Sequence, residues 1–179
     1  MGHWLRDVAD SRAVAAELYV RHGFNVVALH NETPFMYGGR VVCYGPGLPP
    51  PWDDNPLLAK KSVWAVFPHA NVALVVSERY AVLDIDGVQR AALERAHGAL
   101  PTTTCAAVDG RRQLWFAVPP GRSACVDELV GGVRLLTRNA WVMAPPSITR
   151  SMGHRWRWQN VSGCTSAPEW MLEQMEVTQ

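Results

Sequence analysis

Two aspartates, Asp84 and Asp86, are the residues whose type and spacing best suit chemistry. They close the run YAVLDIDG at residues 80–87, in which apolar residues precede and separate them. Successive side chains of a strand point to opposite faces, so we expect both carboxylates on one face, about 7 Å apart. Carboxylates at that spacing can hold Mg²⁺ or Mn²⁺ for phosphoryl chemistry. The alternative interpretation is a strand end with a turn, because Asp-Gly is a favoured turn dipeptide.

Two further groups of residues could bind phosphate or nucleic acid. Arg111 and Arg112 follow the turn-forming pair at 109–110, where guanidinium groups either grip phosphate or remain solvated. The segment HRWRW at 154–158 alternates aromatic residues with arginines. Its tryptophans either belong to the core or form a stacking surface for a single nucleic-acid strand. Trp52, in a proline-rich stretch, is a candidate for contact with a ligand or partner.

Local patterns indicate the elements that must position these residues. Helical spacing, caps and terminal glycine or proline predict helices at 10–22, 53–68, 88–100 and 167–176. Apolar and alternating runs predict strands at 24–30, 71–77, 80–86, 102–108, 112–119, 131–137, 140–145 and 154–160. Short connections predict the hairpins 71–77/80–86, 102–108/112–119 and 131–137/140–145. The proline- and glycine-rich segment 31–56 is predicted to be a long, functional or mobile loop. We therefore expect an α+β fold with a mainly antiparallel sheet and flanking helices.

Composition narrows the class of protein further. The chain has 179 residues, a net charge of +1 and 48% hydrophobic residues. We expect one globular domain over 1–160 and a C-terminal tail, 161–179, with a short helix. The near-balanced charge means that nucleic-acid binding would rest on a local patch. The four cysteines lie far apart, which favours reduced thiols and argues against structural zinc. Without a signal peptide or apolar span, we expect a cytoplasmic protein that does not enter a membrane.

Four segments in this order resemble the primase–polymerase (prim-pol) domain of the archaeo-eukaryotic primase superfamily. They are ELYVRHGFNVVAL (17–29), VWAVFPHANVALVVSERYAVLDID (63–86), LPTTTCAAVDGRRQLWFAVPPG (100–121) and GGVRLLTRNAWVMAPPSITRSMGHRWRW (131–158). The resemblance implies a sheet related to the RNA-recognition motif, and metal-dependent nucleotide transfer in a phage, plasmid or other mobile element. It implies single-stranded or primed DNA and nucleoside triphosphates as substrates, and a helicase or host protein as a possible partner.

The same resemblance implies roles for individual residues. Asp84 and Asp86 match the first motif, D-x-[DE], as catalytic metal ligands for Mg²⁺ or Mn²⁺. Arg111, Arg112, Gln113 and Ser147 fall where the family binds the nucleotide. Gln113 replaces a histidine of the second motif, and Arg134 replaces an aspartate of the third.

These replacements change the chemistry that the site can support. The formal charge of the acidic cluster falls from about −3 to about −1, and a guanidinium cannot ligate a metal ion. Arg134 can instead pair with Asp84 or Asp86. One hypothesis is a prim-pol enzyme with weakened activity. The other is an inactive prim-pol-derived module that binds nucleic acid, a nucleotide or a host protein as a regulatory factor.

Overall fold

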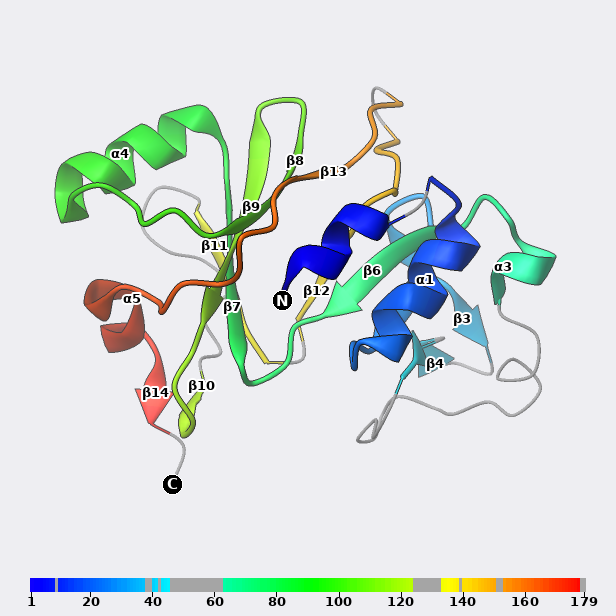
Figure 1. Cartoon of the computed structure of the whole chain (residues 1–179), viewed down its shortest axis with the longest axis horizontal. Coiled ribbons are helices and arrows are strands. Elements are labelled where there is room, and N and C mark those ends of the chain that lie inside the picture. The colour runs from blue at the N-terminus through cyan, green and yellow to red at the C-terminus, as the bar shows by residue number, and fades with distance from the viewer. Residues whose placement is uncertain are drawn as a thin grey trace. The chain divides into compact units, whose positions relative to one another are not determined.

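The computed structural model describes residues 1–8, 10–37, 40–41, 43–45, 63–123, 133–138, 140–150 and 153–177. Helices and two larger β-sheets give the predicted α+β class (Figure 1). The chain forms two compact units, each made of stretches that are separate in the sequence. The first comprises described residues of Met1–Arg6, Val76–Ala140 and Trp158–Gln179, and the second those of Asp7–Val75 and Trp141–Arg157.

The first unit is built on a sheet with strand order β11-β7-β9-β8-β13. Its elements are η1 (His3–Asp7), β7 (Tyr80–Ile85), α4 (Gly87–His97), β8 (Thr104–Val108), β9 (Arg111–Ala117), β10 (Arg122–Ser123), β11 (Arg134–Leu136), β13 (Arg157–Asn160), α5 (Glu169–Glu173) and β14 (Glu176–Val177). β7 is antiparallel to both of its neighbours, β9 and β11, and β10 pairs separately with β14. The central position of β7 places its residues against two strands.

The second unit is built on a sheet with strand order β12-β6-β1-β2, with β5 also paired to β1. Its elements are α1 (Arg12–Arg21), β1 (Val26–His30), β2 (Thr33–Pro34), β3 (Met36–Tyr37), β4 (Arg40–Val41), β5 (Cys43–Tyr44), α3 (Val63–Val66), β6 (Asn71–Val75) and β12 (Trp141–Met143). Only parts of the predicted loop 31–56 and of the predicted helix 53–68 fall within the described residues. Trp52 lies outside them.

Local signals placed several elements correctly. Ser11 caps α1, as predicted, through a hydrogen bond from the Val14 backbone N–H. The hairpin of β8 and β9 is confirmed, with Val108 opposite Arg111. Its two turn residues, Asp109 and Gly110, have φ of 42° and 80°, which is the type I′ geometry that matches the twist of the strands.

Two of the three predicted hairpins are wrong. β6 pairs with β1 and β12, whereas β7 pairs with β9 and β11, so the neighbours β6 and β7 belong to different sheets. The same separation applies to β11 and β12. Val76 follows β6 and Ala140 precedes β12, so both lie where the chain passes between the two sheets. The Val76 N–H donates to the Ala140 carbonyl at 2.7 Å. Every residue of β6 is buried. Its apolar run therefore carried no signal of which strand would lie beside it.

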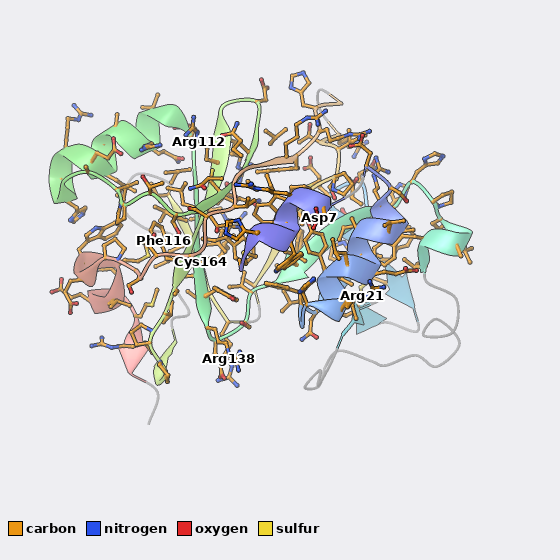
Figure 2. All side chains as sticks on the ribbon, in the orientation of Figure 1. Asp7, Arg21, Arg112, Phe116, Arg138 and Cys164 are labelled. Atoms are coloured by element: carbon orange, nitrogen blue, oxygen red, sulfur yellow. The ribbon has the colours of Figure 1, made fainter. Side chains whose placement is uncertain are left out.

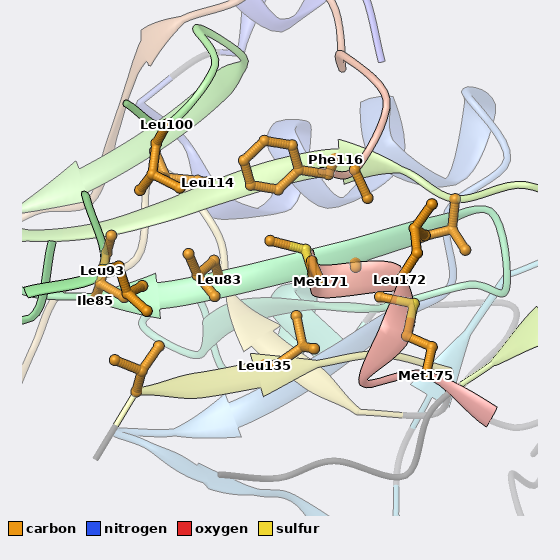
Figure 3. Packing of buried hydrophobic residues seen from close by; sticks show 14 of the residues in the cluster. Leu83, Ile85, Leu93, Leu100, Leu114, Phe116, Leu135, Met171, Leu172 and Met175 are labelled. Atoms are coloured by element: carbon orange, nitrogen blue, oxygen red, sulfur yellow. The ribbon is translucent and has the colours of Figure 1, made fainter. Parts of the chain in front are cut away.

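One face of the first unit's sheet carries its hydrophobic core (Figure 3). Alternate residues of three strands, Leu83, Leu114 and Leu135 among them, face the helices α4 and α5. α5 contributes Met171, which is fully buried, and Leu172. Part of the predicted C-terminal tail therefore packs into the core of this unit.

Met171→Ala tests that contribution. Removing a fully buried side chain should lower the free energy of unfolding by about 2–5 kcal/mol, because the cavity adds to the lost burial. The matched control is Glu173→Ala on the same helix, which is exposed and should change it by less than about 0.5 kcal/mol. Chemical denaturation followed by circular dichroism measures both. Equal stability of the two variants would contradict this packing.

Candidate functional site

The face of this sheet opposite the core brings together the positions of all three motifs. Register places Arg134 directly across from Asp84, and Asp84 directly across from Gln113. Residues that face each other across paired strands point to the same side of a sheet. Arg134, Asp84 and Gln113 therefore form one row over β11, β7 and β9, which we call the motif row.

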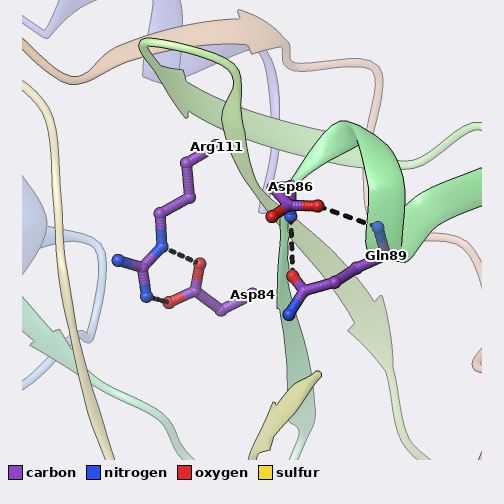
Figure 4. A network of polar contacts seen from close by, with 4 residues as sticks. All are labelled: Asp84, Asp86, Gln89 and Arg111. Carbon is purple, nitrogen blue, oxygen red and sulfur yellow. Dashed lines mark hydrogen bonds and ion pairs between the residues drawn. The ribbon is translucent and has the colours of Figure 1, made fainter. Parts of the chain in front are cut away.

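Asp84 is held by Arg111 through two parallel hydrogen bonds (Figure 4). The Arg111 Nε and Nη2 donate to Oδ1 and Oδ2 of Asp84, each at 2.7 Å. Only 6% of the Asp84 side chain is exposed, against 50% for Arg111. This forked pair neutralises a buried carboxylate and satisfies both of its oxygens.

The partner of Asp84 is thus Arg111. The sequence had suggested Arg134, which replaces an aspartate of the third motif. Arg134 is exposed, and no ion pair joins it to a carboxylate among the residues that the structure describes. The sequence held a signal for the observed pair. A two-residue turn at 109–110 fixes the register of the hairpin, and alternation then puts Arg111 and Gln113 on one face.

Asp86 has a different task from Asp84. β7 ends at Ile85, and Asp86 is the N-cap of α4. Its Oδ1 accepts from the Gln89 backbone N–H at 2.8 Å, and Gln89 Oε1 accepts from the Asp86 N–H at 2.9 Å (Figure 4). This reciprocal pair is a capping box, readable in the sequence as Asp-x-x-Gln before a helix. Asp86-Gly87 therefore begins a helix, rather than the turn that the dipeptide suggested, and the metal role of Asp86 stays a prediction.

The residues present do not fit a two-metal centre. The two carboxylates are Asp84, engaged by a guanidinium, and Asp86, engaged by a helix terminus. Within the described residues, no group of three or more His, Cys, Asp and Glu side chains could hold a metal ion. Arg111 and Arg134 also balance the charge that would attract a second cation.

Gln113 gives the motif row a buried polar group. It is 2% exposed, and its Oε1 has no hydrogen-bond partner among the described residues. A buried acceptor without a donor is unfavourable, by about 1–3 kcal/mol, so the side chain gains if a ligand brings an N–H or O–H. The amide has no positive charge with which to attract phosphate.

Arg112 lies apart from the motif row. Alternation along β9 turns it to the face opposite Arg111. Burial raises the pKa of the Cys105 thiol, and the positive charges of Arg112 and Arg90 oppose that rise. Because the two side chains lie on opposite faces of the sheet, nothing supports the binding of one triphosphate by both Arg111 and Arg112. The nucleotide contact of each stays a prediction.

Ser147 is in the second unit and is fully buried. Its Oγ accepts from the Val72 N–H at 2.7 Å and donates to the Val72 carbonyl at 2.8 Å. The neighbouring Asn71 side chain bonds both the N–H and the carbonyl of Ile148. Sequence reasoning missed this role of Asn71, which joins β6 to the residues that follow β12. The nucleotide contact predicted for Ser147 stays a prediction.

In the aromatic segment 154–158, one tryptophan is buried and the other is half-buried. Trp156 is 3% exposed, and Trp158 is half-buried against Trp115, with ring centroids 6.2 Å apart. Arg157 is exposed, and Arg155 pairs with Asp10 at 2.5 Å. These positions are those of core tryptophans flanked by surface arginines.

Three cysteines fall within the described residues, and all are free thiols. Cys43 and Cys105 are buried, and burial also raises the pKa of the half-buried Cys164. In the described part of the chain, no helix combines the length and apolarity that crossing a membrane requires.

Comparison with known protein families gives one match that covers most of the chain. Residues 15–170 match the family described as bifunctional DNA primase/polymerase, N-terminal. The matched range includes every residue of the motif row as well as Asn71 and Ser147. No curated protein matches the chain.

Arg111→Ala tests the ion pair. Leaving the Asp84 carboxylate buried without its guanidinium should lower the free energy of unfolding by about 1–3 kcal/mol. The matched control is Arg112→Ala, the exposed neighbour on the same strand, which should change it by less than about 0.5 kcal/mol. Urea denaturation compares the two. A similar decrease in the free energy of unfolding of both variants would show that the Asp84–Arg111 pair does not stabilise the fold specifically.

Asp86→Ala tests the capping box. Loss of the cap should lower the free energy of unfolding by about 0.5–2 kcal/mol, because the first turn of α4 loses a hydrogen-bond acceptor. Asp86→Ser removes the carboxylate but keeps a capping oxygen, and should restore most of the stability. Thermal unfolding measures both variants. Equal losses would show that the carboxylate matters for a reason other than capping.

Proposed function

Because this chain belongs to the bifunctional DNA primase/polymerase N-terminal family, we propose that it serves DNA replication as a phosphate-binding prim-pol domain that has lost nucleotidyl transfer. Its ligands are single-stranded or primed DNA and nucleoside triphosphates. On the same family grounds we place it in a phage, plasmid or other mobile element, with a helicase or host protein as its partner. This is the second of the two hypotheses drawn from the sequence.

One observation supports the loss of transfer above all others: the forked pair of Asp84 with Arg111. Phosphoryl transfer depends on cations held by carboxylate oxygens in line with the reacting groups. Both oxygens of Asp84 already accept hydrogen bonds at 2.7 Å. Releasing them breaks two charged hydrogen bonds, each worth roughly 1.5–3 kcal/mol. Arg134, directly across from Asp84, adds repulsion to any cation.

The same face has groups that suit phosphate. Arg134 is exposed and Arg111 half-exposed, so their N–H groups can reach a ligand. Guanidinium groups bind phosphate oxygens through two parallel hydrogen bonds without a metal ion. Binding of this kind weakens steeply as salt rises, because it releases counterions from the nucleic acid.

The alternative is an active enzyme that keeps Asp84 and Asp86 as ligands of Mg²⁺ or Mn²⁺. One observation favours it. Arg111 follows a two-residue turn and is half-exposed, so substrate phosphates can compete for its guanidinium. Asp84 would then be freed when substrate binds.

Primer synthesis and extension on single-stranded DNA distinguish the two. The wild type is compared, with Mg²⁺ and then Mn²⁺, with the double variant Asp84→Asn/Asp86→Ser, which keeps the side-chain volume at 84 and a cap at 86. We expect no product from either protein under conditions in which a control primase is active. Metal-dependent product from the wild type that the double variant does not make would establish the active enzyme instead.

Binding of fluorescent single-stranded DNA in the presence of EDTA tests the retained function. We expect salt-sensitive binding that Arg134→Ala weakens by about tenfold, through the loss of charged hydrogen bonds. Arg95→Ala, an exposed arginine on α4, is the control for the same loss of charge. Equal binding by both variants would show that the motif row does not bind the DNA.

A further inference from the structure

A second group of arginines lies at the end of the same sheet remote from Asp84. β7 is antiparallel to β9 and β11, so the residue before β7 meets the residues that follow the other two strands. Arg79 precedes β7, and Arg138 follows β11. Figure 2 shows Arg112 and Arg138 at opposite ends of this sheet. Along β7, Arg79 and Asp84 are five residues, or roughly 16 Å, apart.

These residues line a concavity of about 280 Å³. Arg79, Arg122 and Arg138 contribute three guanidinium groups, and Glu78 contributes one carboxylate. Val118 and Pro120 form an apolar part of the wall. We call this concavity the arginine pocket.

The pocket carries an excess of positive charge that no described residue balances. Among the described residues, no salt bridge joins Glu78 to any of the three arginines, or any of them to another carboxylate. Like charges around one hollow repel each other, and a concave surface focuses their field on the space they share. An anion in that space relieves the repulsion.

One of the three arginines is held in place before any ligand arrives. Residues 119–122 make a tight turn in which the Arg122 N–H donates to the Pro119 carbonyl at 3.4 Å. Pro120 and Gly121 occupy the two central positions of this turn. Gly121 has a φ of 80°, which is the positive value that the second central position of a type II turn requires. The Arg122 Nη1 also donates to the Leu172 carbonyl at 3.1 Å. A side chain fixed in this way loses less entropy on binding.

The size and the donors together define the ligand. The volume of about 280 Å³ lies at the lower limit of the roughly 300–1,000 Å³ that is usual for drug-sized ligands, which suits a small group. Three guanidinium forks suit the oxygens of a phosphate or diphosphate. We propose that the arginine pocket is a second anion site, which binds a phosphoryl group of about pyrophosphate size. The group comes either from a free diphosphate or from the phosphate of a nucleic-acid strand.

Amide chemical shifts in the ¹⁵N-labelled full chain report on this pocket separately from the motif row. Inorganic pyrophosphate at low salt should shift the Gly121 and Arg122 amides in a saturable way, whatever happens at Gln113. Arg79→Ala/Arg138→Ala should raise the Kd from these amides at least about tenfold, since each arginine contributes charged hydrogen bonds. The control, Arg95→Ala on α4, should change it by about twofold or less.

Two results overturn the proposal: no saturable shift at Gly121 and Arg122 in the wild type, or the same Kd in the double variant. Should the double variant not fold, Arg138→Lys keeps the charge and loses the fork, and is expected to weaken binding severalfold. An unchanged Kd in that variant and in Arg138→Ala counts equally against the pocket.

Single-stranded oligonucleotides with and without a 5′-phosphate identify the source of the group. Stronger shifts with the phosphorylated strand assign the pocket to strand ends, and equal shifts with both assign it to backbone phosphates. Shifts with pyrophosphate alone assign it to a free diphosphate. These shifts are measured at Gly121 and Arg122, so their outcome does not depend on whether DNA binds at Arg134.

Discussion

The buried ion pair between Asp84 and Arg111 governs what the first unit of this protein can do. A carboxylate with 6% exposure on a central strand is tolerable only when its charge is met, and the guanidinium meets it at both oxygens. The β8–β9 hairpin supplies that guanidinium, so the type I′ turn at 109–110 matters for the electrostatics of the sheet. The same two hydrogen bonds occupy both oxygens of the carboxylate that the motif resemblance assigns to a metal ion.

The motif row shows how a site can keep its geometry while its chemistry changes. Positions 84, 113 and 134 still lie side by side on three adjacent strands, as their place in a common family would require. By the motif resemblance, Arg134 stands where an aspartate is expected and Gln113 where a histidine is expected, so the site has one carboxylate fewer and one guanidinium more. A face with Arg134 and a half-exposed Arg111 attracts phosphate directly, where three carboxylates would attract it only through cations.

The family's other segments have structural tasks in this chain. Asn71 and Ser147 bond backbone groups of two segments about 75 residues apart in sequence, and both side chains are buried. Such bonds satisfy polar groups that would otherwise be unpaired in a buried part of the second unit. Both side chains therefore have structural contacts within the residues that match the family, and the nucleotide contact of Ser147 stays a prediction.

The sequence by itself determined the longer helices and strands, the α+β class, the family resemblance and the β8–β9 hairpin, because helix caps, turn dipeptides and period-two patterns are local. It also contained the Asp-x-x-Gln capping box at residues 86–89, since that signal lies within one helical turn. Only the tertiary structure decided that β6 and β7 part into different sheets and that Arg111, not Arg134, meets Asp84. Both outcomes depend on which strands lie side by side. Apolar runs of similar composition pair equally well with many partners, so that choice is made by the packing of the whole chain.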